Sequence, residues 1–219
     1  IDYLQDRRNQ HARMHNLLGD TPMHIKENIK FDDEAAWSFT NLDIANKLCE
    51  KLLTLSNISP DSVITDATAS VGGNTIAFAK HFKHVNAIEL NGGRAEMLEH
   101  NIKLFELENV VIFNDFAQNI IPKMHSDVIF VDPPWALPGV NYKNSPTGTL
   151  LINLIQPNNE LQSFEDFLLE MSQYTKYVVC KLPTNYNFAK LEKAISSVYE
   201  VIDKTFHGRP NTSAVYILK

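Results

Sequence analysis

"SVITDATASVGGNTIAFAKHFKHVNAIEL", residues 62–90, contains a strand, a helix and a second strand in direct succession. Residues 62–67 and 84–90 are rich in apolar and β-branched side chains, and residues 74–82 between them have a helical pattern. Two strands joined through a helix lie parallel in one sheet, since a tight turn joins only antiparallel strands. This stretch therefore predicts an α/β fold built on a parallel sheet.

The same alternation of strands and helices continues to the end of the chain. We predict further helices at 94–105, 163–173 and 188–196, and further strands at 109–113, 127–131, 176–182, 199–206 and 212–218. A short connection joins the last two strands, which makes the last strand antiparallel to its partner. The prediction is a seven-stranded, mostly parallel sheet with an antiparallel last strand and helices on both faces.

The residues before this sheet are predicted to be helical. Residues 2–19 favour one helix, and an amphipathic pattern of a second helix begins at Asn41. We therefore predict a small N-terminal helical extension, or lid, at 1–55 and a core domain at 56–219.

Composition excludes several classes of protein. The chain has 219 residues, a mass of 24.9 kDa and 44% hydrophobic residues, which suits one or two small domains. No apolar run approaches the roughly 20 residues of a membrane-spanning helix, and no secretory signal pattern is visible. The chain begins with isoleucine rather than methionine, which predicts a fragment of a longer protein.

Cysteine, histidine and charge indicate an intracellular protein without a metal site. The two cysteines, Cys49 and Cys180, lie far apart, and the eight histidines show no metal-ligand spacing. We expect a reducing compartment, either the nucleus or the cytoplasm. The net charge of −6 argues against a protein that coats nucleic acid. Basic residues near the C-terminal strands indicate either a small phosphate contact or an ordinary solvated surface.

Several predicted strands end in residues that suit a nucleotide ligand, and such ligands bind beyond the carboxyl ends of parallel strands. The loop Gly72-Gly73-Asn74, after the first strand, fits neither a dinucleotide fingerprint nor a P-loop, and its glycines also suit simple helix packing. Glu89, after the second strand, can accept both hydroxyls of a ribose. Asp115-Phe116, after the third, suits an adenine. Together these residues predict a pocket for an adenosine-bearing cofactor without a polyphosphate.

The fourth strand runs into "DPPW", residues 132–135, at the start of the longest irregular stretch, 132–162. Proline donates no ladder hydrogen bond and fixes φ, so two prolines end the strand and stiffen the turn. Trp135 offers a flat ring on which a base can stack. A long loop in a compact domain is more often functional than idle. A rigid turn with a tryptophan that only packs is the simpler interpretation.

The motifs resemble a known class of enzyme. The strand-end acids and glycine loop resemble the class I S-adenosylmethionine-dependent methyltransferases, which have a Rossmann-like fold. "DPPW" resembles the [DNS]-P-P-[YFW] signature of amino-group methyltransferases. Their target amine is a poor nucleophile, because its lone pair is delocalised into a ring. An oxygen at the first motif position and the carbonyl of the first proline accept its N–H bonds, and the stiff loop holds both acceptors in place.

Longer stretches resemble one family, the trimethylguanosine synthases, which are RNA cap guanine-N2 methyltransferases. The similar segments are Lys30–Asn41, Asp66–Ala79, Ala87–Asn91, Asn114–Phe116, Asp132–Pro138 with Tyr142 downstream, and Leu182–Asn185. The glycine loop and the PPW motif together are fairly specific, whereas the acid positions alone are generic. The resemblance implies S-adenosylmethionine as cofactor and a capped RNA as substrate.

The resemblance also implies roles for individual residues. The cofactor would be bound by Thr40, Asp66, Val71, Gly72, Gly73, Asn74, Glu89, Asp115, Phe116 and Asp132. The catalytic group would be Asp132, Pro133 and Trp135, in which Pro133 orients the N2 amine and Trp135 stacks on the positively charged 7-methylguanine. Further cap contacts would come from Trp37, Ser38 and Pro134. Lys181 and Arg209 are candidates for the cap phosphates because of local positive charge alone. We expect a monomer.

Three departures from the family leave alternatives open. Asp132 stands where the family has serine, so the motif also resembles that of N6-adenine methyltransferases. Ala136-Leu137 replaces two glycines, and Ala35–Phe39 lacks the family's glycine. The alternatives are an N6-adenine or N4-cytosine methyltransferase of DNA or RNA, and a cap- or nucleotide-binding module without turnover. Trp37 is interpreted either as part of the lid or as an anchor that packs the extension onto the core.

Overall fold

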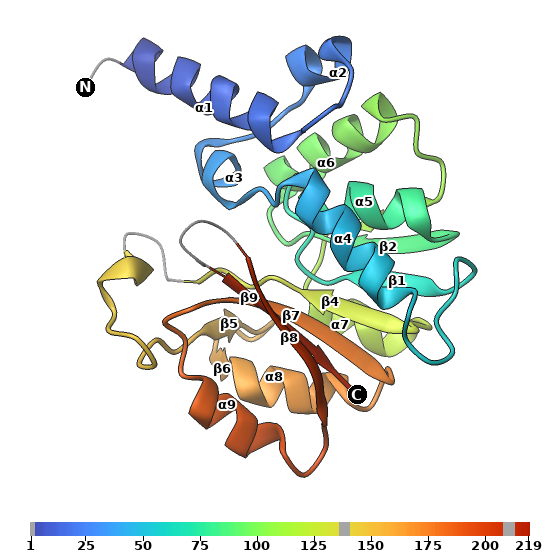
Figure 1. The fold of residues 1–219 in the computed structure, drawn as a ribbon, viewed down its shortest axis with the longest axis vertical. Helices are drawn as coiled ribbons and strands as arrows, with labels where there is room; N and C mark the ends of the chain where they lie inside the picture. Colours follow the sequence, from blue (N-terminus) through green and yellow to red (C-terminus); the bar gives the residue numbers. More distant parts are fainter. Residues whose placement is uncertain (1–2, 136–140, 208–212) are drawn as a thin grey trace. The chain divides into compact units, whose positions relative to one another are not determined.

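The computed structural model describes residues 3–135, 141–207 and 213–219 (Figure 1). The chain forms two compact units, Ile1–Ala117 and Gln118–Lys219. The first unit contains the N-terminal helices together with the first three strands. The predicted division into an extension at 1–55 and a core at 56–219 stays a prediction.

The first unit is built on three parallel strands in the order β3-β2-β1. The strands are β1 (Val63–Asp66), β2 (His84–Ile88) and β3 (Val110–Phe113). Helix α5 (Gly73–His81) connects β1 to β2, and α6 (Gly92–Leu104) connects β2 to β3. The strand–helix–strand arrangement predicted from residues 62–90 is therefore confirmed. It places the loops after all three strands at one edge of this sheet.

From Tyr3 onward, four helices precede β1 in the first unit. They are α1 (Tyr3–Leu17), α2 (Met23–Asn28), α3 (Asp33–Ser38) and α4 (Leu42–Leu52), and α4 packs on α5 (Figure 1). The sequence predicts α1 and α4 but neither of the short helices between them. Asp32 caps α3, because its Oδ1 accepts the N–H of Ala35 at 2.8 Å. A capping aspartate followed by two acidic residues is a signal for a helix start. A helix of six residues is too short for its apolar periodicity to show in the sequence.

In the second unit, four of the described strands pair in the order β4-β7-β9-β8. They are β4 (Val128–Val131), β7 (Tyr177–Pro183), β8 (Val201–His207) and β9 (Ser213–Leu218). β4 and β7 are parallel, and β9 is antiparallel to both β7 and β8. Helices α8 (Phe164–Met171) and α9 (Phe188–Ile195) pack on each other (Figure 1). The predicted fold, seven strands of a mostly parallel sheet with an antiparallel last strand, is confirmed.

The stretch 132–162 is less irregular than its sequence predicts. It contains the 3-10 helix η2 (Tyr142–Asn144) and an antiparallel pair of short strands, β5 (Asn153–Ile155) and β6 (Leu161–Ser163). Strands of three residues are too short for an alternating pattern to stand out. Along the chain, α7 (Ala117–Ile120) and η1 (Ile121–Lys123) follow β3 and precede β4.

Asn101, on α6, is one of the polar residues of the interior. Its side chain is fully buried. The Oδ1 atom accepts the N–H of Lys30 at 2.8 Å, and Nδ2 donates to the carbonyls of Lys30 at 2.8 Å and Val71 at 2.9 Å. One side chain thus joins the segment before α3 to the glycine loop after β1.

Both cysteines, Cys49 and Cys180, are buried free thiols. No helix in the described part of the chain is long and apolar enough to cross a membrane.

Replacement of Asn101 by leucine is expected to lower the free energy of unfolding by about 2–4 kcal/mol, because three backbone groups lose their buried partner. Urea denaturation measures this change. Lys103→Gln, on the same helix, removes only the exposed Lys103–Glu99 ion pair and should cost less than about 0.5 kcal/mol. Equal stability of N101L and the wild type would contradict this account of the contact.

Candidate functional site

The loop after β1 takes its shape from Asp66. This side chain is fully buried; its Oδ1 accepts the N–H of Thr68 at 3.2 Å and its Oδ2 accepts the hydroxyl of Thr75 at 2.7 Å. Ser70 and Gly72 have φ values of 49° and 108°, so the chain turns sharply before α5. A φ of 108° suits glycine, which has no Cβ to clash. Asp66 therefore supports the loop from the interior.

The glycine loop lies directly against Thr40. A Cβ on Gly73 would be 3.0 Å from the backbone nitrogen of Thr40, so only glycine lets the two segments approach this closely. Asn74 Nδ2 donates to Thr40 Oγ1 at 3.1 Å. The Oδ1 atom of Asn74 is buried and has no hydrogen-bond partner among the described residues. The structure thus brings together Thr40, Gly72, Gly73 and Asn74, as predicted from residues far apart in sequence.

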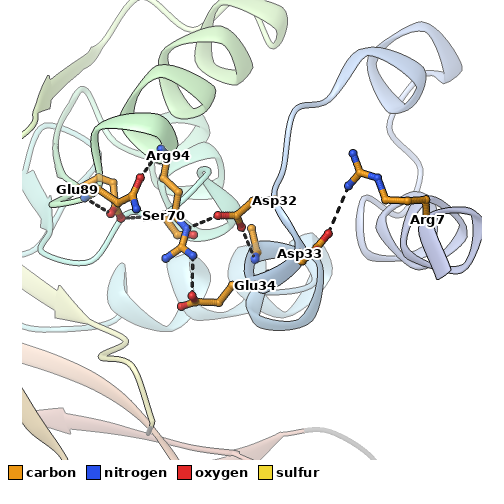
Figure 2. Close-up of polar contacts among 9 residues, drawn as sticks. Arg7, Asp32, Asp33, Glu34, Ser70, Glu89 and Arg94 are labelled. Atoms are coloured by element: carbon orange, nitrogen blue, oxygen red, sulfur yellow. Dashed lines mark hydrogen bonds and ion pairs between the residues drawn. The ribbon is translucent and has the colours of Figure 1, made fainter. Parts of the chain in front are cut away.

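Glu89, at the end of β2, links two of the loops (Figure 2). Its Oε2 accepts the N–H of Ser70 at 2.8 Å, and its Oε1 accepts the N–H of Asn91 at 2.7 Å. Burial raises the pKa of the Glu89 carboxyl, and the two backbone N–H groups oppose that rise. Each oxygen still has a lone pair for another donor, as binding of ribose hydroxyls requires.

The loop after β3 joins the same edge of the sheet. Asn114 Nδ2 donates to the carbonyls of Glu89 at 2.8 Å and Leu90 at 3.0 Å. The next residue, Asp115, accepts the N–H of Phe116 at 2.7 Å. The strand-end residues Glu89, Asp115 and Phe116 therefore lie on adjacent loops, as the sequence predicts.

Trp37 and Ser38, at the end of α3, are both exposed. The Trp37 side chain is 61% exposed, with the guanidinium carbon of Arg13 5.1 Å from its ring centroid. Arg13 also donates to the carbonyl of Ala36 at 2.8 Å. The exposed ring thus contacts Arg13 of α1, and the role of Trp37 as lid or anchor stays a prediction.

In the second unit, the motif after β4 forms a compact charged cluster. Lys181 Nζ, on β7, lies 2.7 Å from Asp132 Oδ2, and Trp135 Nε1 donates to Asp132 Oδ1 at 3.2 Å. The same lysine nitrogen lies 5.4 Å from the Trp135 ring centroid. Pro133 is buried and Pro134 is exposed. The carboxylate therefore holds both the tryptophan and the lysine.

Burial raises the pKa of Asp132, and Lys181 and the Trp135 N–H oppose that rise. Only 14% of the Asp132 side chain and 12% of that of Lys181 are exposed, so water screens the pair weakly. The sequence assigned Lys181 to the cap phosphates, and the structure gives it a carboxylate partner. Arg209, the other predicted phosphate ligand, and Ala136-Leu137 lie outside the described residues.

Two residues of the same unit position Trp135 further. The Tyr142 ring lies edge-on to Trp135, with centroids 5.0 Å apart and an interplanar angle of 84°. Asn185 Nδ2 donates to the carbonyls of Tyr142 at 2.8 Å and Ser145 at 3.0 Å. Asn185 Oδ1 is buried without a hydrogen-bond partner among the described residues. Asn185 is the asparagine of the LPTN segment, whose role the sequence did not reveal.

Sequence reasoning missed two other polar residues near the glycine loop, Asn101 and Arg94. Asn101 follows Leu98 on the buried side of α6, and a polar residue on an apolar stripe is the signal that could have identified it. Arg94 carries no such signal, because its acidic partners belong to α3, a helix that the sequence did not predict. Over the described residues, no group of three or more His, Cys, Asp or Glu side chains is placed to hold a metal ion.

Comparison with known sequences agrees with this geometry. The model of a family described as RNA cap guanine-N2 methyltransferase matches residues 61–213. An uncharacterized protein, L320, of Acanthamoeba polyphaga mimivirus is 38% identical over 59% of this chain and 51% of its own length. The trimethylguanosine synthase of Schizosaccharomyces pombe is 25% identical over 75% of this chain and 67% of its own length. The chain thus spans about half of the first relative and about two thirds of the second.

Solved structures share the fold at low sequence identity. TrmN from Thermus thermophilus superposes with a TM-score of 0.58 and 16% identity, over 80% of this chain and 48% of that chain. Methanocaldococcus jannaschii Trm5 in complex with adenosine gives a TM-score of 0.55 and 16% identity, over 89% of this chain and 51% of that chain. These likenesses confirm the predicted class I methyltransferase fold and, at such identities, nothing finer.

Lys181→Met is expected to destabilise the protein by about 3 kcal/mol at neutral pH, because it leaves a buried carboxylate without its cation. The loss depends on pH. Burial raises the pKa of Asp132 in the folded state, and K181M removes a charge that opposes this rise. The folded protein then binds a proton more tightly than the unfolded chain does. The stability that proton binding at Asp132 contributes to K181M is fully present below the ordinary aspartate pKa, and it is lost as the pH rises through the raised pKa.

Urea unfolding of K181M across a pH series measures this loss. The double variant D132N/K181M is the control, since it has neither charge and should recover most of the stability without the pH dependence. A K181M protein whose stability does not change between acid and neutral pH would show that the pair does not form.

Proposed function

The chain belongs to the RNA cap guanine-N2 methyltransferase family, and on that premise we propose that it methylates the exocyclic N2 amine of a 7-methylguanosine RNA cap. The observation that carries this proposal is the motif Asp132-Pro133-Pro134-Trp135, directly after β4, with its tryptophan held by hydrogen bond and ring contact. The likeness to a trimethylguanosine synthase over 75% of the chain supports the cap as target. The proposal includes action as a monomer in the nucleus or the cytoplasm.

S-adenosylmethionine is the cofactor, and when bound it supplies an electrophilic methyl group. The residues of the first unit fit this molecule. Asn74 Oδ1 is a buried acceptor that lacks a donor, which an ammonium group of the cofactor would supply. We assign the ribose to Glu89 and the adenine to Asp115 and Phe116. The side chains of Asp66 and Val71 are buried, and their proposed role is to shape the loop that binds the cofactor.

The residues of the second unit suit a flat, positively charged base. Trp135 would stack on 7-methylguanine, whose charge strengthens its attraction to an aromatic face. The Pro133 carbonyl would accept an N–H of the N2 amine and so orient its lone pair. Because the Asp132 carboxylate already accepts the Trp135 N–H and pairs with Lys181, its proposed role is to hold the stacking ring. Correct positioning supplies most of the rate in such a transfer, and a strong base is not required.

Asp132 supports a second candidate function. A carboxylate at the first position of "DPPW" resembles the N6-adenine methyltransferases and would suit transfer to an adenine or cytosine amine. Its ion pair with Lys181 favours the cap, because a carboxylate bound by lysine and tryptophan is less available to a substrate amine.

Transfer of labelled methyl from S-adenosylmethionine distinguishes these functions. The 7-methylguanosine cap analogue, unmethylated GTP, and adenine-containing DNA and RNA are offered in parallel. We expect label on the 7-methylguanosine cap alone. Label on adenine would overturn the cap assignment in favour of the second candidate. Cofactor binding without label on any substrate would indicate a binding module without turnover.

Trp135→Ala is expected to lower kcat/KM for the cap about 5- to 150-fold, since base stacking on an aromatic ring is worth about 1–3 kcal/mol. Steady-state kinetics with the cap analogue measures this loss. Trp135→Phe is the matched control: it retains a ring but loses the N–H to Asp132, so it should keep more activity than W135A. Equal kinetics in W135A and the wild type would contradict the stacking role.

A further inference from the structure

We propose that Arg94 is a positioning residue for cofactor binding, because it holds the segment Asp32–Thr40 against the loop that carries Glu89. This segment, called the α3 segment below, contains α3 and the residues at both of its ends. The inference rests on the part of the proposed function that assigns Glu89 and Asn74 to the cofactor. It does not depend on the identity of the methylated base.

Arg94 binds the start of the α3 segment with two ion pairs (Figure 2). Its Nε lies 2.7 Å from Asp32 Oδ2, and its Nη2 lies 2.6 Å from Glu34 Oε2. Asp32 uses its other oxygen to cap α3. Because only 18% of the Arg94 side chain is exposed, these pairs are less screened than ordinary surface pairs. The guanidinium therefore fixes the N-terminus of α3.

A short chain of hydrogen bonds connects Arg94 to Glu89. The backbone N–H of Arg94 donates to Asn91 Oδ1 at 3.1 Å, and the backbone N–H of Asn91 donates to Glu89 Oε1 at 2.7 Å. Arg94 and Glu89 thus belong to one hydrogen-bonded turn at the start of α6. Any movement of that turn changes the position of the carboxylate assigned to the ribose.

The other end of the α3 segment contacts the glycine loop. Thr40 Oγ1 accepts from Asn74 Nδ2, and the Thr40 backbone nitrogen lies 3.0 Å from where a Cβ on Gly73 would be. The segment is therefore attached at its start to the Glu89 turn and at its end to Gly73 and Asn74. Both are groups of residues assigned above to S-adenosylmethionine, so the α3 segment, together with the Ser70–Glu89 hydrogen bond, contributes to their spacing.

Loss of Arg94 should change this spacing without unfolding the unit. Asn101 independently fixes Lys30 to Val71, and Phe39 is buried in the core. The α3 segment would stay attached through these contacts and through Thr40, while its start moves away from the Glu89 turn. The expected consequence is weaker cofactor binding in a folded protein.

The chain offers a matched control on the same turn of α3. Asp33 pairs with Arg7 of α1 at 3.5 Å, and its side chain is 71% exposed (Figure 2). Asp33→Asn removes one negative charge from the first turn of α3, as Glu34→Gln does, but the charge it removes does not pair with Arg94. Since Arg7 has no contact with the Glu89 turn in the described structure, D33N should leave cofactor affinity unchanged.

Calorimetric titration with S-adenosylmethionine, in the absence of RNA, tests the proposal. We expect Arg94→Gln to raise the Kd about fivefold or more and Glu34→Gln to raise it about twofold, whereas D33N should match the wild type. In methyl transfer, R94Q should raise the KM for S-adenosylmethionine while kcat at saturation stays within about twofold. High salt should weaken binding to the wild type more than binding to R94Q, because it screens the ion pairs.

The outcomes separate this proposal from the cofactor assignment itself. Glu89→Gln is the reference, and it should weaken binding about tenfold. If E89Q weakens binding and a folded R94Q does not, the role of Arg94 is overturned. If E89Q has no effect, the cofactor assignment has failed. Equal losses in D33N and R94Q would mean that the charge of α3, and not this contact, matters. If R94Q does not fold, the Kd values of E34Q and D33N decide: a higher Kd for E34Q supports the role of Arg94, and equal values overturn it.

Discussion

The buried carboxylate of Asp66 makes the hydrogen bonds on which the glycine loop of the first unit depends. It ends β1 at a point where the chain must turn from a buried strand into a buried helix. A buried polar group is tolerated only when it is hydrogen-bonded, and Thr68 and Thr75 provide the donors. With these contacts made, the loop reaches the conformation in which Ser70 meets Glu89 and Gly73 meets Thr40.

The second unit also has an aspartate at the end of a buried strand, but this carboxylate has different partners. Asp132 also follows a fully buried strand, but its oxygens bind a lysine from another strand and the indole of Trp135. A neutral serine at this position would need no such cation. The aspartate therefore makes sense together with Lys181, and the two charges hold an aromatic ring beside the prolines. In this chain the departure from the family motif is compensated locally, which is why it supports rather than contradicts a stacking role for the tryptophan.

The N-terminal segments are bound to the first unit by buried and partly buried polar contacts. Asn101 binds the segment before α3, Arg94 binds the start of α3, and Asn74 binds the residue after it. All three polar contacts come from the helices that follow β1 and β2. The same helices position the glycine loop and Glu89. The proposed cofactor residues and the segment that approaches them thus share one set of supports.

The sequence alone determined the parallel sheet, the antiparallel last strand, the long helices and the loops on which Gly73, Glu89 and Asp115 lie. These features depend on periodicity within about ten residues and on the chain direction of consecutive strands, both of which are local. Only the tertiary structure decided the partners of the charged groups. Lys181 is 49 residues from Asp132, and Arg94 is 62 residues from Asp32. No local pattern specifies such pairs, because they depend on which side chains the packed elements bring within hydrogen-bond distance. The same reason explains Trp37, whose exposure follows from how α3 packs and not from its own chemistry.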